Sequence, residues 1–107
     1  MPTSNSNGSQ TATIDTEHTL ATISTDVTAV IGVDLNALVL GDTVILRVKL
    51  KVRSAGTTRL AYEAVYSNVQ HELVALSVPV ASTNEIVFTL EQTDGTGRAF
   101  PWEIWEL

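Results

Sequence analysis

The most constraining feature of the sequence is an alternation of period two from Thr43 to Arg53, in which one face is wholly apolar and the other carries Thr43 and Ile45 followed only by basic residues. Its apolar face carries Val44, Leu46, Val48, Leu50 and Val52. Successive side chains of a β-strand point to opposite sides, so a period of two residues is typical of a strand with one buried face. The segment therefore predicts a strand and also indicates which of its faces meets a core.

A second alternating segment, Arg59 to Tyr66, follows a short turn, and the two predict a β-hairpin. Other segments are rich in β-branched and aromatic residues and are separated by Gly, Asn, Asp, Ser or Pro. They predict strands within Thr16–Ile23, Val27–Leu35, Glu72–Pro79, Glu85–Gln92 and Arg98–Leu107. Leu35–Leu40 could form a single helical turn, capped by Asp34 or Asn36 and ended by Gly41.

A chain of 107 residues suits one domain. About seven short strands with turn signals between them predict an all-β fold, a single-domain antiparallel β-sandwich or small barrel. Residues 1–13 consist largely of Ser, Thr, Asn, Gly and Gln and offer little to bury. We therefore expect a flexible N-terminal arm over residues 1–13 and a β domain over residues 14–107.

The composition excludes several classes of function. Twelve acidic residues against six Lys and Arg give a net charge of −6, which argues against nucleic acid or an anionic membrane as the main partner. The chain has no cysteine, which rules out disulfides, thiolate metal sites and cysteine nucleophiles. It shows no signal peptide at its start and no apolar run near the ~20 residues that cross a bilayer, so we expect a soluble protein.

No motif points to catalysis. His18 and His71 each lack a second histidine or a carboxylate at a ligand spacing, so we expect neither a metal nor a catalytic role for them. No acid pair stands beside the apolar wall that would raise one pKa for glycoside hydrolysis. The loop Asp94–Arg98 lacks both phosphate-binding and dinucleotide-binding patterns and predicts a hairpin turn. The sequence predicts a non-enzymatic protein with no cofactor and no small-molecule substrate.

Four of the six basic residues lie on one face of the Thr43–Arg53 strand, namely Arg47, Lys49, Lys51 and Arg53. Like charges two residues apart on a strand lie ~6.6 Å from each other and repel mildly unless opposite charges face them. Glu63, Glu91 and Glu103 on other strands could pair with this basic stripe at ~0.2–1 kcal/mol each. Alternatively, the stripe could meet an acidic neighbouring subunit.

The C-terminal segment alternates its aromatic residues. Phe100, Trp102 and Ile104 share one face, which we assign to the core, and Trp105 and Leu107 share the other. Pro101 cannot donate a ladder hydrogen bond, which places this strand at a sheet edge or puts Pro101 at its very start. Trp105 and Leu107 then either form a docking surface or, for Trp105, cover the end of the core.

Four segments carry a resemblance as a group. They are Gly41-Asp42-Thr43 leading into Val44–Arg53, Ser54–Tyr62, Thr89–Thr93 and Gly95–Trp102. With them, about residues 14–107 resemble small β-rich virion proteins of tailed bacteriophages, most like a head decoration (cement) protein. The resemblance implies a protein made in the host cytoplasm that stabilises the head from the capsid surface. Its partners would be the major capsid protein and copies of itself, which in this group often form a trimer.

Two alternatives remain open. Small β modules also occur in tails, baseplates and fibres, and a β-sandwich could instead bind carbohydrate if Tyr62, Tyr66, Trp102 and Trp105 formed a stacking platform. The sequence offers no catalytic, cofactor-binding or metal-binding residue. The candidate interface residues are Arg47, Lys49, Lys51, Arg53, Trp105 and Leu107.

Overall fold

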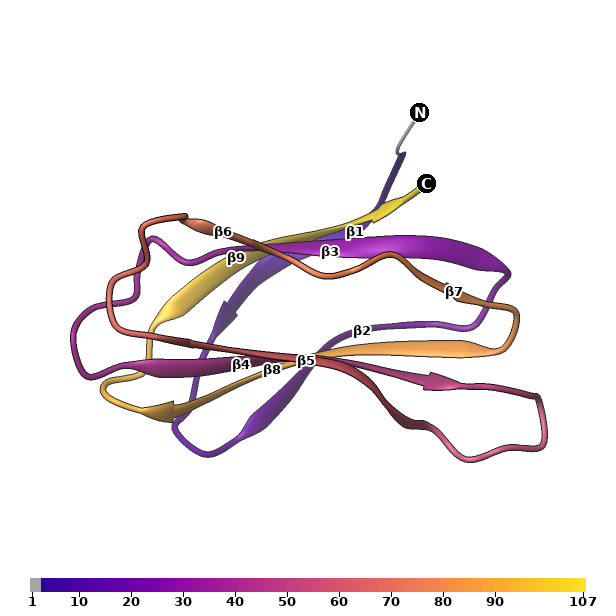
Figure 1. The fold of residues 1–107 in the computed structure, drawn as a ribbon, viewed down its shortest axis with the longest axis horizontal. Coiled ribbons are helices and arrows are strands. Elements are labelled where there is room, and N and C mark those ends of the chain that lie inside the picture. Colours follow the sequence, from indigo (N-terminus) through magenta and orange to yellow (C-terminus); the bar gives the residue numbers. More distant parts are fainter. Residues whose placement is uncertain (1–2) are drawn as a thin grey trace.

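A computed structural model describes residues 3–107, which form strands and turns in two antiparallel sheets stacked as the layers of a β-sandwich (Figure 1). The strands are β1 (Thr3–Thr11), β2 (Glu17–Ile23), β3 (Val27–Asp34), β4 (Thr43–Lys51), β5 (Arg59–Ser67), β6 (Val74–Leu76), β7 (Val80–Ser82), β8 (Glu85–Asp94) and β9 (Ala99–Glu106). The predicted all-β class is confirmed. None of the described residues belongs to a helix that could span a membrane.

The chain passes between the two sheets several times, so each sheet contains strands from distant parts of the sequence. Sheet A has the order β1-β9-β3-β6, with β7 also pairing with β3, and sheet B has the order β2-β8-β4-β5. The predicted hairpin is confirmed, because β4 pairs with β5. The turn at residues 95–98 was predicted to close a hairpin, and that is wrong: it carries the chain from β8 in sheet B to β9 in sheet A.

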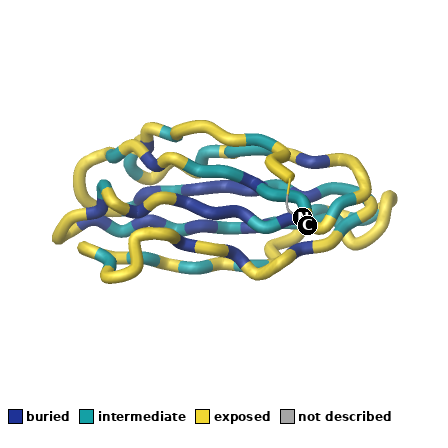
Figure 2. Tube along the Cα trace, turned by 90° about the horizontal axis from the view of Figure 1, so that it is seen from above, coloured by how far each residue is buried: buried dark blue, intermediate teal, exposed yellow. Residues whose placement is uncertain are grey.

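The core lies between the sheets and is built from strand positions two apart. In sheet B, β4 buries Val44, Leu46 and Val48, as the alternation predicts. Buried side chains from the other central strands complete the core: Ala29, Ile31, Val33, Ile86, Phe88, Leu90, Phe100 and Ile104. Figure 2 shows these buried positions concentrated along the middle strands, with exposed residues at the loops and edges. Each sheet therefore has one inner face and one outer face in contact with solvent.

Residues 3–11 of the predicted arm form strand β1 in the structure. β1 pairs antiparallel with β9 from Thr3↔Glu106 to Thr11↔Ala99, although most of its side chains are exposed. Backbone hydrogen bonds to a neighbouring strand need no apolar side chains, so a polar composition does not prevent pairing. That the segment is mobile in the free chain stays a prediction.

The position of β1 also changes the prediction for β9, which lies between β1 and β3 rather than at a sheet edge. Pro101 is tolerated because it stands near the start of the strand, where β3 pairs only from Trp102 onward.

Two further local predictions differ from the structure. Residues 35–42 form two hydrogen-bonded turns, Leu38 N–H to Leu35 O and Asp42 N–H to Val39 O, in place of a helical turn. The predicted strand over Glu72–Pro79 is shorter in the structure, where only Val74–Leu76 pair, as β6. β7 (Val80–Ser82) follows it and was not predicted, so that β1 and β7 raise the number of strands within residues 3–107 to nine.

Buried polar groups fix the corner at which β8 crosses to β9. The Asp42 carboxylate is 1% exposed and accepts hydrogen bonds from Val39 N–H (3.1 Å) and Arg98 Nε–H (2.9 Å). The buried Gln92 amide donates to the carbonyls of Asp94 and Thr96, and its oxygen accepts from Arg98 N–H. Gly95 has a φ of 89°, and a Cβ there would collide with the Asp42 carboxylate. This corner therefore requires glycine at position 95.

The Asp42 carboxylate should make stability depend on pH. Its burial opposes ionisation, but the hydrogen bonds from Val39 and Arg98 outweigh burial and hold the pKa of Asp42 below its usual value. Because the carboxyl of the unfolded chain has a pKa of ~3.9, the stabilisation is complete above about pH 5 and is lost as the pH falls through the lower, folded-state pKa. Urea unfolding of Asp42→Asn should show ~1–3 kcal/mol less stability at neutral pH and a weaker acid dependence. The same acid dependence in both chains would contradict this assignment.

Candidate interaction surfaces

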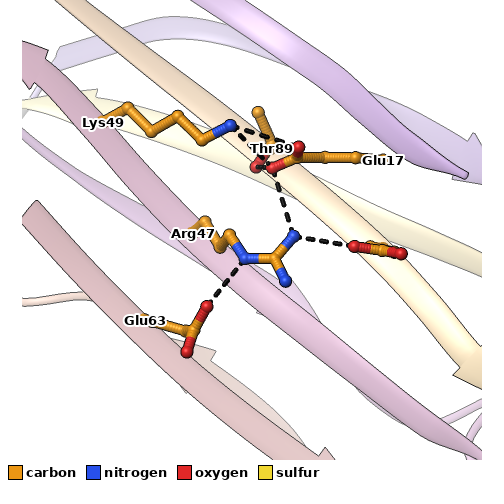
Figure 3. Close-up of polar contacts among 6 residues, drawn as sticks. Glu17, Arg47, Lys49, Glu63 and Thr89 are labelled. Carbon is orange, nitrogen blue, oxygen red and sulfur yellow. Dashed lines mark hydrogen bonds and ion pairs between the residues drawn. The ribbon is translucent and has the colours of Figure 1, made fainter. Parts of the chain in front are cut away.

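The outer face of sheet B carries an ion-pair network centred on Arg47 (Figure 3). Arg47 Nε lies 2.7 Å from Glu63 Oε2, and its Nη1 lies 2.7 Å from Glu91 Oε1 and 3.3 Å from Glu17 Oε2. Lys49 Nζ lies 3.0 Å from Glu17 Oε2. In the strand order β2-β8-β4-β5, the neighbours of β4 carry Glu91 (β8) and Glu63 (β5), and the next strand, β2, carries Glu17. These carboxylates neutralise Arg47 and Lys49 within the chain.

Hydrogen bonds stabilise the charged forms in this network. The Thr89 hydroxyl donates to Glu17 Oε2 at 2.6 Å, and this bond outweighs burial and, with Lys49 and Arg47, lowers the pKa of Glu17. Glu63 and Glu91 raise the pKa of Arg47 above its usual value. The predicted pairing with Glu63 and Glu91 is therefore confirmed. Glu17 was missed because its alignment with β4 depends on the strand order, which no local pattern reveals.

The other two members of the basic stripe lie elsewhere. β4 ends at Lys51, so Arg53 belongs to the turn of the β4–β5 hairpin and not to the strand face. Within residues 3–107, Lys51, Arg53 and Arg59 form no ion pair. We call residues 51–59 the hairpin tip. The basic stripe thus divides into a paired half on sheet B and an unpaired half at this tip.

The network predicts unequal effects of removing arginines. Arg47→Gln leaves three carboxylates near one another without their shared cation, so unfolding free energy should fall by about 1–2 kcal/mol. Arg53→Gln removes the same charge from an exposed turn and should change stability by less than about 0.5 kcal/mol. Chemical denaturation of the two variants checks this difference, and equal losses would contradict it.

The outer face of sheet A carries exposed apolar side chains, whereas the centre of the outer face of sheet B carries the ion-pair network. Val74 and Leu76 of β6 are each 57% exposed. Trp105 of β9 lies opposite Val30, and its ring covers Gly32: a Cβ on Gly32 would come within 2.7 Å of two ring carbons. We call Val30, Val74, Leu76 and Trp105 the sheet A patch. Its side chains lie outside the core, on the face predicted for Trp105.

Beside the patch lies a shallow groove of about 340 Å³. We call it the sheet A groove, and its walls include Asn7, Asp34, Pro101, Glu103 and Trp105. The Glu103 carboxylate, expected to pair with the basic stripe, instead accepts a hydrogen bond from Ser4 Oγ at 3.2 Å on this opposite sheet. A larger concavity of about 630 Å³ opens between the sheets beside the hairpin tip, where its titratable side chains are Asp26 and Lys51.

The structure separates the aromatic residues that could have formed a sugar-stacking platform. Tyr62, Tyr66 and Trp102 pack against the core, whereas Trp105 lies on the outer face of sheet A. Trp102 lies beneath the backbone of β1, because a Cβ on Gly8 would come within 3.3 Å of its indole. The four rings therefore share no single surface. Leu107 is 59% exposed, and its N–H donates to Thr28 O.

The two tryptophans should respond differently to truncation. Trp102→Ala removes a ring packed against the core and should cost ~3 kcal/mol or more of unfolding free energy. Trp105→Ala removes a ring from an outer face, so the free energy of unfolding should fall by about 1 kcal/mol or less. The same change should weaken association of the chain with a partner protein. Thermal melts together with a measurement of association separate these outcomes. Equal melting losses with association unchanged would show that both rings serve the core.

Neither histidine joins a metal-ligating group, since no three such side chains gather within residues 3–107. His18 Nε2 accepts a hydrogen bond from Thr13 N–H at 3.0 Å and so helps to hold the turn before β2.

Comparison of the chain with family models, curated proteins and solved structures found no match.

Proposed function

We propose that this chain is a non-enzymatic structural protein of a tailed-phage particle, a decoration (cement) protein that binds the capsid lattice through the outer face of sheet A. The sheet A patch is the observation that carries the proposal. Contiguous exposed apolar side chains on a folded protein are typical of a surface that meets another protein. A large ring such as Trp105 at its centre has the character of an interface anchor.

The rigidity of the sandwich fits this role. A cement protein stabilises a shell by holding neighbouring lattice subunits in one arrangement, so its binding surface has to keep its shape. Strand positions on a packed sheet do this better than loops, because the core behind them locks their side chains. Val30, Val74 and Trp105 all stand on strands, and the ring of Trp105 lies over the backbone of β3 at Gly32.

The particle itself provides the test of location. Purified virions should carry the chain, and imaging should place its density on the outside of the head. Density on the tail, baseplate or fibres would favour an accessory module at those sites, and absence from the virion would overturn the proposal.

A matched pair of variants tests the surface. Val74 on the sheet A patch and Val65 of β5 on sheet B are equally exposed, at 57% each. Val74→Asp should reduce binding to particles stripped of the chain by about tenfold or more, because an interface disfavours an unpaired buried charge. Val65→Asp should leave binding unchanged. Co-sedimentation with the particles measures both, and equal effects would contradict the assignment of sheet A as the binding face.

A further inference from the structure

Within residues 3–107, the ion pairs leave one group of cations without a carboxylate partner. Within the described part of the chain, Arg47, Lys49 and Arg98 each pair with a carboxylate, whereas the three cations of the hairpin tip do not. Val52, between Lys51 and Arg53, is 81% exposed. The hairpin extends beyond the body of the sandwich at one end (Figure 1). It therefore presents a basic and partly apolar projection to solvent.

The sheet A groove has the complementary chemistry. Asp34 and Glu103 line it, and within residues 3–107 neither is paired with a cation. Pro101 and the indole of Trp105 provide apolar walls next to these carboxylates. A guanidinium stacks on an indole and pairs with a carboxylate through the same planar group. At about 340 Å³, near the low end of ordinary ligand pockets at ~300–1,000 Å³, the groove suits inserted side chains.

The hairpin tip cannot reach the groove of its own chain. The hairpin extends from sheet B at the end of the sandwich where β3 begins, whereas Asp34 stands at the other end of β3 on sheet A (Figure 1). The two complementary surfaces therefore lie on opposite layers and at opposite ends. Only a second copy can bring a hairpin tip to a groove, and each copy carries both halves of the contact.

We propose that the hairpin tip of one copy docks into the sheet A groove of a second copy, with Arg53 over Trp105 and between Asp34 and Glu103. The contact is head-to-tail, so repetition closes a ring or extends a chain. It rests on the proposed function and specifies its copy-to-copy contact; Trp105 borders both the groove and the sheet A patch, so the test uses the free protein, where no particle competes for Trp105. Loss of capsid binding with this association intact would count against the proposed function alone.

The test uses two variants that keep the fold and its hydrogen bonds. The hairpin variant is Arg53→Gln with Arg59→Gln, and the groove variant is Asp34→Asn with Glu103→Gln. Analytical ultracentrifugation at low salt should show self-association of the unaltered chain and at least about tenfold weaker association of each variant alone. A mixture of the two should form a dimer, because the groove of the first and the hairpin of the second are intact.

A control variant and a change of salt concentration complete the experiment. Asp15→Asn with Asp94→Asn makes the same charge change at exposed positions away from the groove and should leave association unaltered. Raising the salt from about 0.05 to 0.5 M should weaken association. The proposal is overturned if the unaltered chain stays monomeric to about 1 mM at low salt. It is also overturned if either variant associates as tightly as the unaltered chain, or if the mixture remains monomeric.

Discussion

The burial of one face of each sheet against the other is the constraint on which the rest of this structure depends. Val44, Leu46 and Val48 pack inward from β4, and strand alternation then sends Arg47 and Lys49 outward. A slip of one residue would bury Arg47 and expose the apolar face, so the core specifies the register. The chemistry of both outer faces follows from how the core is packed.

A second constraint acts at the corner between the sheets. Asp42 and Gln92 are buried, and their hydrogen bonds to Arg98 and to the residue 95–98 turn direct the chain from β8 to β9. Three of the segments that resemble phage virion proteins include these residues. In this chain those segments stabilise the fold, while Trp105 and the β6 side chains that we assign to binding lie outside them. The segments that suggest the proposed class of protein are therefore not those that form the proposed binding surface.

Much of the fold could be predicted from local pattern, and the contacts between distant segments could not. Alternation predicted β4, the hairpin with β5 and the inner face of Phe100 and Ile104. The pairing of Glu17 with Arg47 depends on the order β2-β8-β4, which no local alternation encodes. β1 was missed because composition reports what side chains can bury, whereas backbone hydrogen bonds to β9 hold this strand. For the candidate surfaces, alternation placed Trp105 correctly but could not show Gly32 beneath its ring or Asp34 beside it.

The two outer faces therefore differ in how far their charged and apolar side chains find partners within the chain. Sheet B neutralises Arg47 and Lys49 with its own carboxylates, while sheet A carries an indole, exposed valine and leucine and two carboxylates that form no ion pair within residues 3–107. Oxidative footprinting by mass spectrometry tests most directly which outer face binds a partner. It compares the chain bound to the particle with the monomer released from it. The account predicts protection of Trp105 and of the β6 peptide on assembly, with Val65 on sheet B labelled equally in both states. Protection of Val65 with Trp105 unchanged would contradict it.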